Sequence, residues 1–232
     1  MTVPLTASRP AGRPDVAVVD YGAGNLVSIE QGLTAAGARV RLVQRGADIG
    51  RPDLLVVPGV GAAAPAMARL AAGDLVAPIV DRIAAGAPVL GICLGLQLLF
   101  DGSDEDGAAT LGVLPGRTVR IPGAPTLPHI GWNQVDLAGT HPAFEGIAPG
   151  TDFYFVHSYV AQPDRGALDV VLAETTHGSP FPSAVARGHL LGVQFHPERS
   201  GRDGLRLLAN VVAWASAVAG NAANAGNAGS AA

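Results

Sequence analysis

The chain of 232 residues contains a single cysteine, Cys93, at a position where a thiol can do chemistry. The apolar run 88–92 before it is typical of a buried strand, and the sequence after it is typical of a helix. Gly91 and Gly95 stand two residues to either side, and glycines at these places allow the sharp strand-to-helix turn of a nucleophile elbow. At a helix N-terminus, unpaired N–H groups and the helix dipole stabilise a thiolate over a thiol. The pattern predicts that Cys93 is a nucleophile, and the alternative is a small buried hydrophobic residue.

A candidate base and a residue to orient it lie near the other end of the chain, in the segment 192–198, Gly-Val-Gln-Phe-His-Pro-Glu. In an extended segment, residues two apart face the same way, so Gln194, His196 and Glu198 share one side. A nucleophile, a base and an orienting carboxylate together make a catalytic triad. We therefore predict the triad Cys93, His196 and Glu198. The alternative for His196 is a surface histidine or a hydrogen-bonded structural one.

Two glycine-rich loops follow predicted strands, at the edge where open α/β sheets bind ligands. The loop 58–61, Pro-Gly-Val-Gly, precedes a predicted helix and would offer backbone N–H groups beside the elbow, as an oxyanion requires. Alternatively, its glycines only make a tight turn. The loop 20–25, Asp-Tyr-Gly-Ala-Gly-Asn, lacks the third glycine of the dinucleotide fingerprint, and the next strand ends without an acidic residue. We expect no bound nucleotide, no other cofactor and no metal.

Composition indicates one domain with a conventional core. Hydrophobic residues make up 48% of the chain, and a chain of this length buries roughly 70–75% of its unfolded surface. A single cysteine excludes an intramolecular disulfide and fits a reducing compartment. The net charge is −4 and all 15 basic residues are scattered arginines, so no nucleic-acid partner is expected. Residues 1–14 lack the apolar core of a signal peptide and no apolar run reaches the length of a membrane span, so we expect a cytoplasmic protein that does not bind membranes.

Apolar runs alternate with helical stretches, which predicts an α/β fold: a mostly parallel open sheet flanked by helices, with an antiparallel extension in the C-terminal half. The expected strands are Val16–Asp20, Arg39–Val43, Leu54–Val57, Val89–Ile92, Thr118–Ile121, Asn133–Leu137, Phe153–Val160, Asp169–Glu174, Ser183–Ala186 and Leu190–Phe195. The expected helices are Leu26–Ala36, Ala62–Ala85 with a break near Gly73, and Asp203–Val218. The chain then divides into a flexible segment 1–14, a domain 15–218 and a disordered tail 219–232 of Gly, Asn, Ala and Ser.

The two central motifs resemble those of a known family. The run 91–97, Gly-Ile-Cys-Leu-Gly-Leu-Gln, and the segment 192–198 resemble the signatures of the class I (triad) glutamine amidotransferases, whose fold is flavodoxin-like, and the resemblance covers about residues 15–218. Further motifs resemble the glutaminase subunits of imidazole glycerol phosphate synthase, in histidine biosynthesis. These motifs are 20–25, 58–61, 128–133 (Pro-His-Ile-Gly-Trp-Asn), 154–159 (Tyr-Phe-Val-His-Ser-Tyr) and 199–201 (Arg-Ser-Gly). The chain departs from that family in having arginine rather than lysine at 199 and a less acidic stretch at 101–105.

The resemblance implies a role for each matching residue. Cys93 would attack the carboxamide of L-glutamine, His196 would protonate the departing ammonia, and Glu198 would orient His196. The backbone N–H groups of Val60 and Leu94 would hold the oxyanion. The substrate would be positioned by Gly59, Gly61, Gln97, Glu105, His157, Ser158 and Tyr159. For Gln97 and Tyr159 the alternative is an ordinary structural polar residue.

A partner subunit is expected on chemical grounds. Ammonia is largely protonated in water near neutral pH, so it has to reach its acceptor directly, and this chain is too short for a second, acceptor-binding domain. In the family the partner is a TIM-barrel cyclase, and the pair makes imidazole glycerol phosphate, an aminoimidazole carboxamide ribonucleotide and glutamate. The resemblance implies a heterodimer interface that includes Asn25, Trp132, Tyr154 and Arg199. Trp132 is alternatively a packing residue.

Two other functions stay open at this point. The first is a glutaminase subunit of another synthase, such as the one that makes pyridoxal phosphate, but the motifs 20–25 and 128–133 argue against this function. The second is a catalytically silent regulatory subunit, and the complete triad argues against it.

The glycines of the loop 58–61 would let a peptide flip, turning its N–H into or out of the site. This predicts low glutaminase activity in the lone subunit and higher activity when the partner holds its nucleotide.

Overall fold

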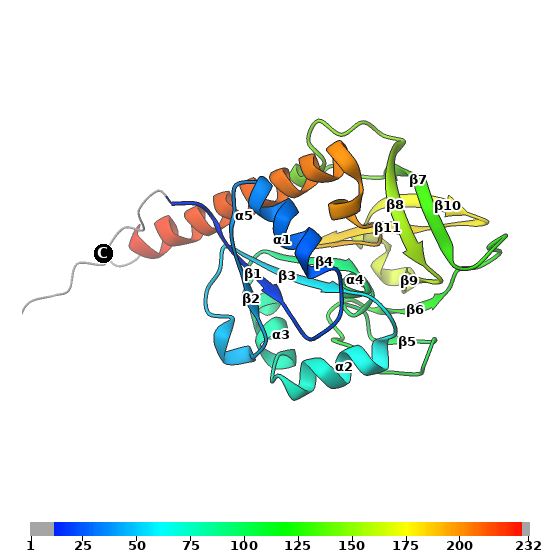
Figure 1. Cartoon of the computed structure of the whole chain (residues 1–232), viewed down its shortest axis with the longest axis horizontal. Coiled ribbons are helices and arrows are strands. Elements are labelled where there is room, and N and C mark those ends of the chain that lie inside the picture. Colours follow the sequence, from blue (N-terminus) through cyan, green and yellow to red (C-terminus); the bar gives the residue numbers. More distant parts are fainter. Residues whose placement is uncertain (1–11, 229–232) are drawn as a thin grey trace, which may run out of the picture.

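The computed structural model describes residues 12–228, and the predictions for residues 1–11 and 229–232 lie outside this range. One nine-stranded sheet, in the order β2-β1-β3-β4-β12-β11-β10-β7-β8, has helices on both faces (Figure 1). The strands are β1 Asp15–Val19, β2 Arg39–Val43, β3 Leu54–Gly59, β4 Val89–Cys93, β5 Gly102–Ser103, β6 Gly116–Arg120, β7 His129–Leu137, β8 Thr151–His157, β9 Tyr159–Pro163, β10 Val171–His177, β11 Ser179–Arg187 and β12 Leu190–Val193. The helices are α1 Leu26–Ala35, α2 Ala63–Ala72, α3 Val76–Ala84, α4 Leu94–Gln97 and α5 Gly201–Ala228, with 3₁₀ turns at Gly46–Asp48, Pro142–Phe144, Arg165–Val170 and Pro197–Arg199.

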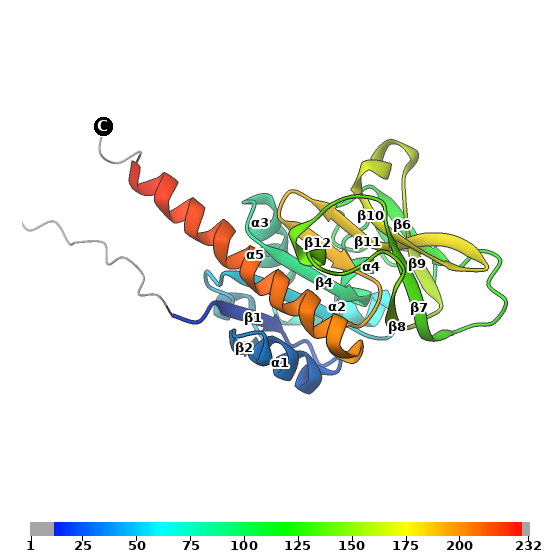
Figure 2. The ribbon, with the colours of Figure 1, turned by 90° about the horizontal axis from the view of Figure 1, so that it is seen from above.

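Five strands, β2, β1, β3, β4 and β12, run parallel and form one half of the sheet. β1 shows how both faces are buried: Val16 and Val18 pack into the core beneath α1 and α5, whereas Ala17 and Val19 pack into the core beneath α2 and α3. A strand covered on both faces has a continuous apolar sequence, which is the pattern of β1, β3, β4 and β12, whereas the edge strand β2 alternates arginine with apolar residues. Figure 2 shows α5 lying across the sheet on the face that it shares with α1.

The other half of the sheet is antiparallel, through β11, β10, β7 and β8. The predicted fold class is therefore confirmed, and the strand order of the parallel half is the flavodoxin-like order. A smaller sheet, β5-β6-β9, was not predicted. Its strand β5 has only two residues and carries no recognisable pattern.

The predicted strand Phe153–Val160 is wrong as a single element. The chain breaks at Ser158, and the residues on either side belong to different sheets: β8 pairs with β7, whereas β9 pairs with β6. The carbonyl of Ser158 accepts a hydrogen bond from the N–H of Ile121 at 3.0 Å, which holds the crossing point. An apolar run cannot reveal such a change of sheet, because both pieces are extended. Other bounds also shift. β10 begins after a 3₁₀ turn at 165–170, β12 ends at Val193, and β7 and β11 begin earlier than predicted, at His129 and Ser179.

The predicted helix break near Gly73 is confirmed, since α2 and α3 are separate and Asp74 between them has φ 53°. Among the described residues no single helix is long and apolar enough to cross a membrane; α2 and α3 taken together have the composition, but they are bent by 94°. The predicted end of the last helix at Val218 is wrong, because α5 continues to Ala228 through part of the segment expected to be disordered. Alanine has the highest helix propensity, and it carries the helix past the asparagines and glycines there.

Candidate active site

Cys93 lies at a strained strand-to-helix turn. It ends β4, directly precedes α4, and has φ 55° and ψ −109°, a region that residues other than glycine rarely occupy. Gly91 and Gly95 are required because neighbouring backbone atoms leave no room for a side chain at either position. A Cβ on Gly91 would lie 2.7 Å from the carbonyl oxygen of Gly95, and a Cβ on Gly95 would lie 1.8 Å from that of Val57. The structure thus has the geometry of a nucleophile elbow at the carboxyl edge of the parallel strands.

His196 and Glu198 form a buried pair behind the nucleophile. The ring nitrogen Nδ1 of His196 lies 2.8 Å from Oε1 of Glu198, and the two side chains are 5% and 1% exposed. Burial lowers the pKa of His196, but interactions with Cys93 and Glu198 outweigh it and raise the pKa to about 10. The other ring nitrogen, Nε2, has no hydrogen-bond partner among residues 12–228. The arrangement leaves one charged edge of the imidazole free to exchange a proton with the sulfur or with a substrate.

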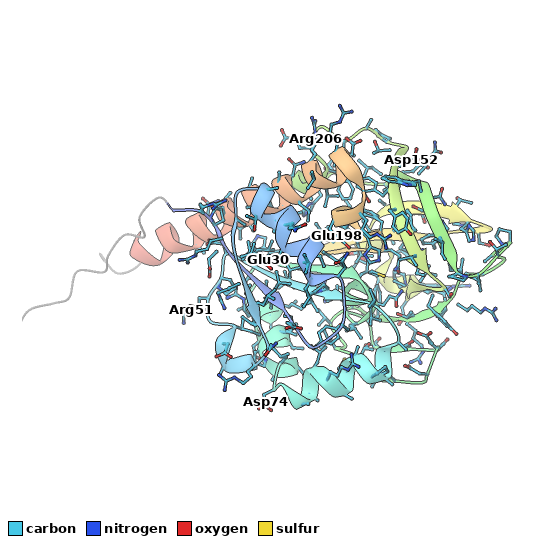
Figure 3. The ribbon with its side chains drawn as sticks, viewed as in Figure 1. Glu30, Arg51, Asp74, Asp152, Glu198 and Arg206 are labelled. Carbon is cyan, nitrogen blue, oxygen red and sulfur yellow. The ribbon has the colours of Figure 1, made fainter. Side chains whose placement is uncertain are left out.

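The segment that carries His196 is fastened to β8. The N–H of His196 donates to the carbonyl of Tyr154 at 2.9 Å, and the hydroxyl of Ser200 donates to the carbonyl of His196 at 2.6 Å while accepting from the N–H of Tyr154 at 2.9 Å. Sequence reasoning gave Ser200 no role, although it lies in the motif 199–201. Figure 3 shows the labelled Glu198 in the middle of the molecule, near α1, which carries Glu30.

A cavity of about 520 Å³ opens over the nucleophile. Most of the residues predicted to bind glutamine or its oxyanion lie in its wall, from both halves of the chain. They are Val60, Gly61, Leu94, Gln97, Glu105, His157, Ser158 and Tyr159, and Cys93 lines it as well. Gly59 lies just behind the wall, in β3, where its register partner is Cys93. The structure brings these residues together, and their individual roles in binding stay predictions.

Gly59 and Gly61 behave differently in the loop after β3. A Cβ on Gly59 would lie 2.2 Å from the hydroxyl of Tyr21 and 3.0 Å from Cβ of Leu94, so its lack of a side chain serves packing. Gly61 has φ 91°, and a Cβ there would meet no described atom within 4 Å, so its lack of a side chain serves conformation. The hydroxyl of Tyr21 is buried without a hydrogen-bond partner in the described part of the chain, and burial raises its pKa. Tyr21 lies beneath the proposed oxyanion loop, a neighbour that sequence reasoning did not find.

Glu105 lines the cavity, and its neighbour Asp106 anchors the loop that carries it. Asp106 accepts a hydrogen bond from the N–H of Ala64 at 2.6 Å, in the first turn of α2, and another from the N–H of Ala108. Burial raises the pKa of Glu105, and the charge of Asp106 raises it further. Asp106 thus links the Glu105 loop to the helix that follows the oxyanion loop, a connection that sequence reasoning missed because the two segments are far apart in the chain.

Hydrogen bonds within the protein restrict what Gln97 and His157 can offer a ligand. The amide nitrogen of Gln97 donates to the carbonyl of Tyr159 at 2.8 Å and to Oε1 of Gln194 at 3.0 Å, which uses both of its hydrogens. Only the amide oxygen of Gln97 is left, and an oxygen acceptor suits a substrate ammonium. Both ring nitrogens of His157 are also engaged, with His129 and with the carbonyl of Tyr159.

Three of the four residues predicted for the partner interface, Trp132, Tyr154 and Arg199, lie close together. Trp132 on β7 is 57% exposed and stands opposite Tyr154 on β8, and the guanidinium of Arg199 lies 4.2 Å from the centre of the Tyr154 ring. Asn25 caps α1, accepting from the N–H of Ser28. Exposure of Trp132 argues against the alternative that it is a packing residue, since a buried core position would exclude water.

The fold and the site define a class of enzyme, and the family model of glutamine amidotransferase class-I matches residues 17–214. A relative from Moorella thermoacetica named imidazole glycerol phosphate synthase subunit HisH is 46% identical over 196 residues, which cover 84% of this chain and 92% of the relative. A relative of the same name from Synechococcus elongatus is 46% identical over 206 residues, covering 87% and 94%. The chain belongs to the class I glutamine amidotransferase family and, within it, to the family of HisH subunits of imidazole glycerol phosphate synthase.

Solved structures agree on the fold at much lower sequence identity. A crystal structure of a glutamine amidotransferase superimposes with a TM-score of 0.69 at 20% identity, over 87% of this chain and 98% of the other. The structure of PurLQS from Thermotoga maritima also gives a TM-score of 0.69, at 19% identity. At these identities the likeness concerns the fold alone.

Proposed function

We propose that this chain is the glutaminase subunit of an imidazole glycerol phosphate synthase, which hydrolyses L-glutamine to glutamate and supplies ammonia for histidine biosynthesis. The observation that carries the proposal is a thiol on a strained elbow in the wall of a cavity, together with a buried His196–Glu198 pair that interacts with it. A thiolate nucleophile, an imidazolium acid and an orienting carboxylate are the parts needed to open an amide through a covalent intermediate. The names of relatives at 46% identity supply the synthase.

In the proposed mechanism, the sulfur of Cys93 forms a bond to the carboxamide carbon of glutamine. The negative charge moves to the amide oxygen, where the N–H groups of Leu94 and the Val60 region stabilise it. His196 gives its Nε2 proton to the leaving nitrogen, so that the C–N bond breaks, ammonia departs and a thioester stays on Cys93. His196 then takes a proton from water, which attacks the thioester and releases glutamate. Glu198 holds the ring in the orientation that both proton transfers need.

We also propose that the ammonia passes to a TIM-barrel cyclase subunit bound as a heterodimer, and that the pair works in the cytoplasm. The proposed contact is the face formed by Trp132, Tyr154 and Arg199. The family motif 20–25 adds Asn25 to it. Tryptophan, tyrosine and arginine are the residues that most often carry binding energy at protein interfaces. Their clustering on β7, β8 and the turn at Pro197–Arg199 supports this placement.

The substitution Cys93→Ala tests the proposal in the reconstituted complex with the cyclase. Glutamine-dependent synthesis of imidazole glycerol phosphate should be lost, because the chain has no other thiol. Synthesis from added ammonium salts should continue at the wild-type rate, because the acceptor chemistry lies on the other subunit. Glutamate release by an enzyme-coupled assay and product formation by absorbance measure the two. Substantial glutamine turnover by the variant would contradict the assigned nucleophile.

A further inference from the structure

Gln194 is fully buried at 0% exposure, and neither the triad nor the proposed substrate contacts account for it. Its amide nitrogen Nε2 lies 3.6 Å from the sulfur of Cys93, and its amide oxygen Oε1 lies 3.0 Å from the amide nitrogen of Gln97. Burying a primary amide is costly unless its donors and acceptors are engaged. Gln194 is therefore placed where one end of its amide contacts the nucleophile itself.

A backbone carbonyl determines which end of that amide faces the sulfur. The carbonyl oxygen of Tyr159 can only accept, so the group of Gln97 that lies 2.8 Å from it has to be the NH₂ group. The same NH₂ group faces Gln194, so the Gln194 atom opposite it has to be the acceptor Oε1. The Nε2 donor of Gln194 is then left pointing at Cys93. A flipped amide would put two donors face to face at Gln97 and an oxygen acceptor against the sulfur.

The carbonyl of Tyr159 also accepts a hydrogen bond from a row of two neutral histidines, His157 and His129. Nδ1 of His157 lies 2.9 Å from this carbonyl and must donate, which leaves Nε2 of His157 as the acceptor for Nδ1 of His129 at 3.0 Å. Nε2 of His129 in turn accepts from the amide nitrogen of Asn133 at 3.2 Å, and that nitrogen also donates to the carbonyl of Thr176. Two backbone carbonyls, at opposite ends of the row, require the same direction for every hydrogen bond between them.

We propose that Gln194 is a positioning residue for the nucleophile: it donates an N–H to the sulfur of Cys93, and the carbonyl of Tyr159, acting through Gln97, fixes the direction of that donor. A donor held against a thiolate stabilises the charged form and restricts the sulfur to one position over the elbow. Gln97, which lines the cavity, then has two functions, since its NH₂ group orients Gln194 while its amide oxygen stays available to a ligand. This inference rests on the proposed glutaminase activity for its kinetic test, but not for its chemical test.

Two substitutions of Gln194 distinguish its contact with the sulfur of Cys93 from its hydrogen bond with Gln97. Gln194→Glu keeps an oxygen acceptor for the NH₂ group of Gln97 but offers the sulfur no N–H donor. Gln194→Met has a similar length and loses both contacts. Thr175→Val is the matched control, because Thr175 is 2% exposed and its hydroxyl donates to the carbonyl of Gln134 at 2.9 Å, away from Cys93. It removes one buried hydrogen bond and leaves the nucleophile untouched.

The chemical readout is the rate at which iodoacetamide alkylates the protein, which reports Cys93 alone because the chain has one cysteine. The kinetic readout is glutamine hydrolysis in the complex with the cyclase, with kcat and KM determined separately. We expect both Gln194 variants to lose about 10-fold to 100-fold in alkylation rate and in kcat, the effect of losing a hydrogen bond to a charged group, with KM within about 2-fold of wild type as for a contact that does not bind substrate. Thr175→Val should match wild type in both readouts.

Three results would overturn the inference. Wild-type alkylation in either Gln194 variant would show that the sulfur does not depend on the donor. Wild-type alkylation and kcat in Gln194→Glu, with both reduced in Gln194→Met, would show that Gln194 only supports Gln97. A raised KM with unchanged kcat would assign Gln194 to substrate binding. Circular dichroism and thermal unfolding identify a variant that has not folded, in which case the other variant carries the test. If wild-type protein alkylates rapidly but the complex does not hydrolyse glutamine, the proposed function fails while the positioning of Cys93 is still measured.

Discussion

At the residue scale, two buried histidines of one site are pushed toward opposite charge states. Burial lowers the pKa of both, but His196 has Cys93 and Glu198 as partners and its pKa is raised to about 10. His157 has no carboxylate among the interactions that shift its pKa, and burial lowers that pKa to about 3. Environments that separate the pKa values of like residues identify which one exchanges protons. The opposite shifts support the proposed role of His196 as the acid and base of the site, and they favour a neutral His157 that forms hydrogen bonds only.

The roles within the triad predict an order of damage. His196→Ala removes the group that protonates the leaving nitrogen, whereas Glu198→Ala leaves a base that still samples the productive orientation. We expect the loss in kcat for Glu198→Ala to be smaller by roughly 10²-fold, as for the corresponding roles in serine proteases. Glutaminase kinetics in the complex with the cyclase measure both. A correctly folded Glu198→Ala variant that is more damaged than His196→Ala would reverse the assigned roles.

At the element scale, the elbow joins β3, β4 and α4 through contacts that leave no room for a side chain. Gly59 is paired with Cys93 across the β3–β4 ladder, and Gly95 packs its Cα against the carbonyl of Val57 in β3. The short helix α4 is thereby pressed onto the sheet. The strained conformation of Cys93 persists because the surrounding strand and helix fix it on both sides.

Gly95→Ala therefore tests the elbow directly. Its Cβ would lie 1.8 Å from the carbonyl oxygen of Val57, so β3 and α4 would have to separate. We expect a loss of about 1–3 kcal/mol or more in the free energy of unfolding, as for overpacked cores, together with loss of glutaminase activity. Gly166→Ala is the control, because a Cβ there would meet none of the described atoms within 4 Å. Chemical denaturation compares them, and equal stabilities for the two variants would contradict the packing argument.

Elements with strong local signals could be predicted from the sequence, and connections between distant segments could not. The parallel strands, the elbow and the break near Gly73 follow from apolar runs and glycines close together in the chain. The division of 153–160 between two sheets depends on which strands pair with β8 and β9, and no local pattern encodes that choice. For the same reason the segment 192–198 placed Gln194 on the side of His196 but did not reveal its contact with Cys93, which lies 101 positions away in sequence.

At the scale of the whole molecule, the cavity is lined by segments from the parallel half of the sheet and by the crossing between β8 and β9. The parallel half supplies Cys93 and the glycine loop, whereas β8, β9 and the crossing residue Ser158 supply the opposite wall of the cavity. The proposed partner face on β7 and β8 belongs to the same antiparallel half. A partner bound there contacts strands that continue directly into the wall of the site, which gives a physical route for coupling between the subunits.

That route makes the isolated chain an informative test. Gly61 gives the loop 58–61 the freedom to turn a peptide N–H into or out of the site, and a partner can favour one state only if it interacts differently with the two. We expect glutaminase activity to be low in the isolated subunit, higher in the complex, and highest when the cyclase holds its nucleotide acceptor. Steady-state rates under the three conditions measure this. Equal rates would remove the coupling and leave the triad assignment intact.

The histidine row also gives the whole molecule a characteristic sensitivity to acid. Burial lowers the pKa of His129 to about 4 and that of His157 to about 3, with neighbouring histidines contributing, whereas an unfolded histidine titrates near 6.5. Below about pH 6.5 the unfolded state binds protons that the folded state does not, so stability falls with pH. Their contribution is fully present above that pH and is lost as the pH falls through the folded values. We expect the double variant His129→Gln, His157→Gln to show a smaller decline in urea midpoint between pH 7 and pH 4. The slope of its free energy of unfolding against pH should fall by the equivalent of up to about two bound protons. An unchanged slope would mean that these histidines are charged in the folded protein, against the hydrogen-bond directions that their neighbours require.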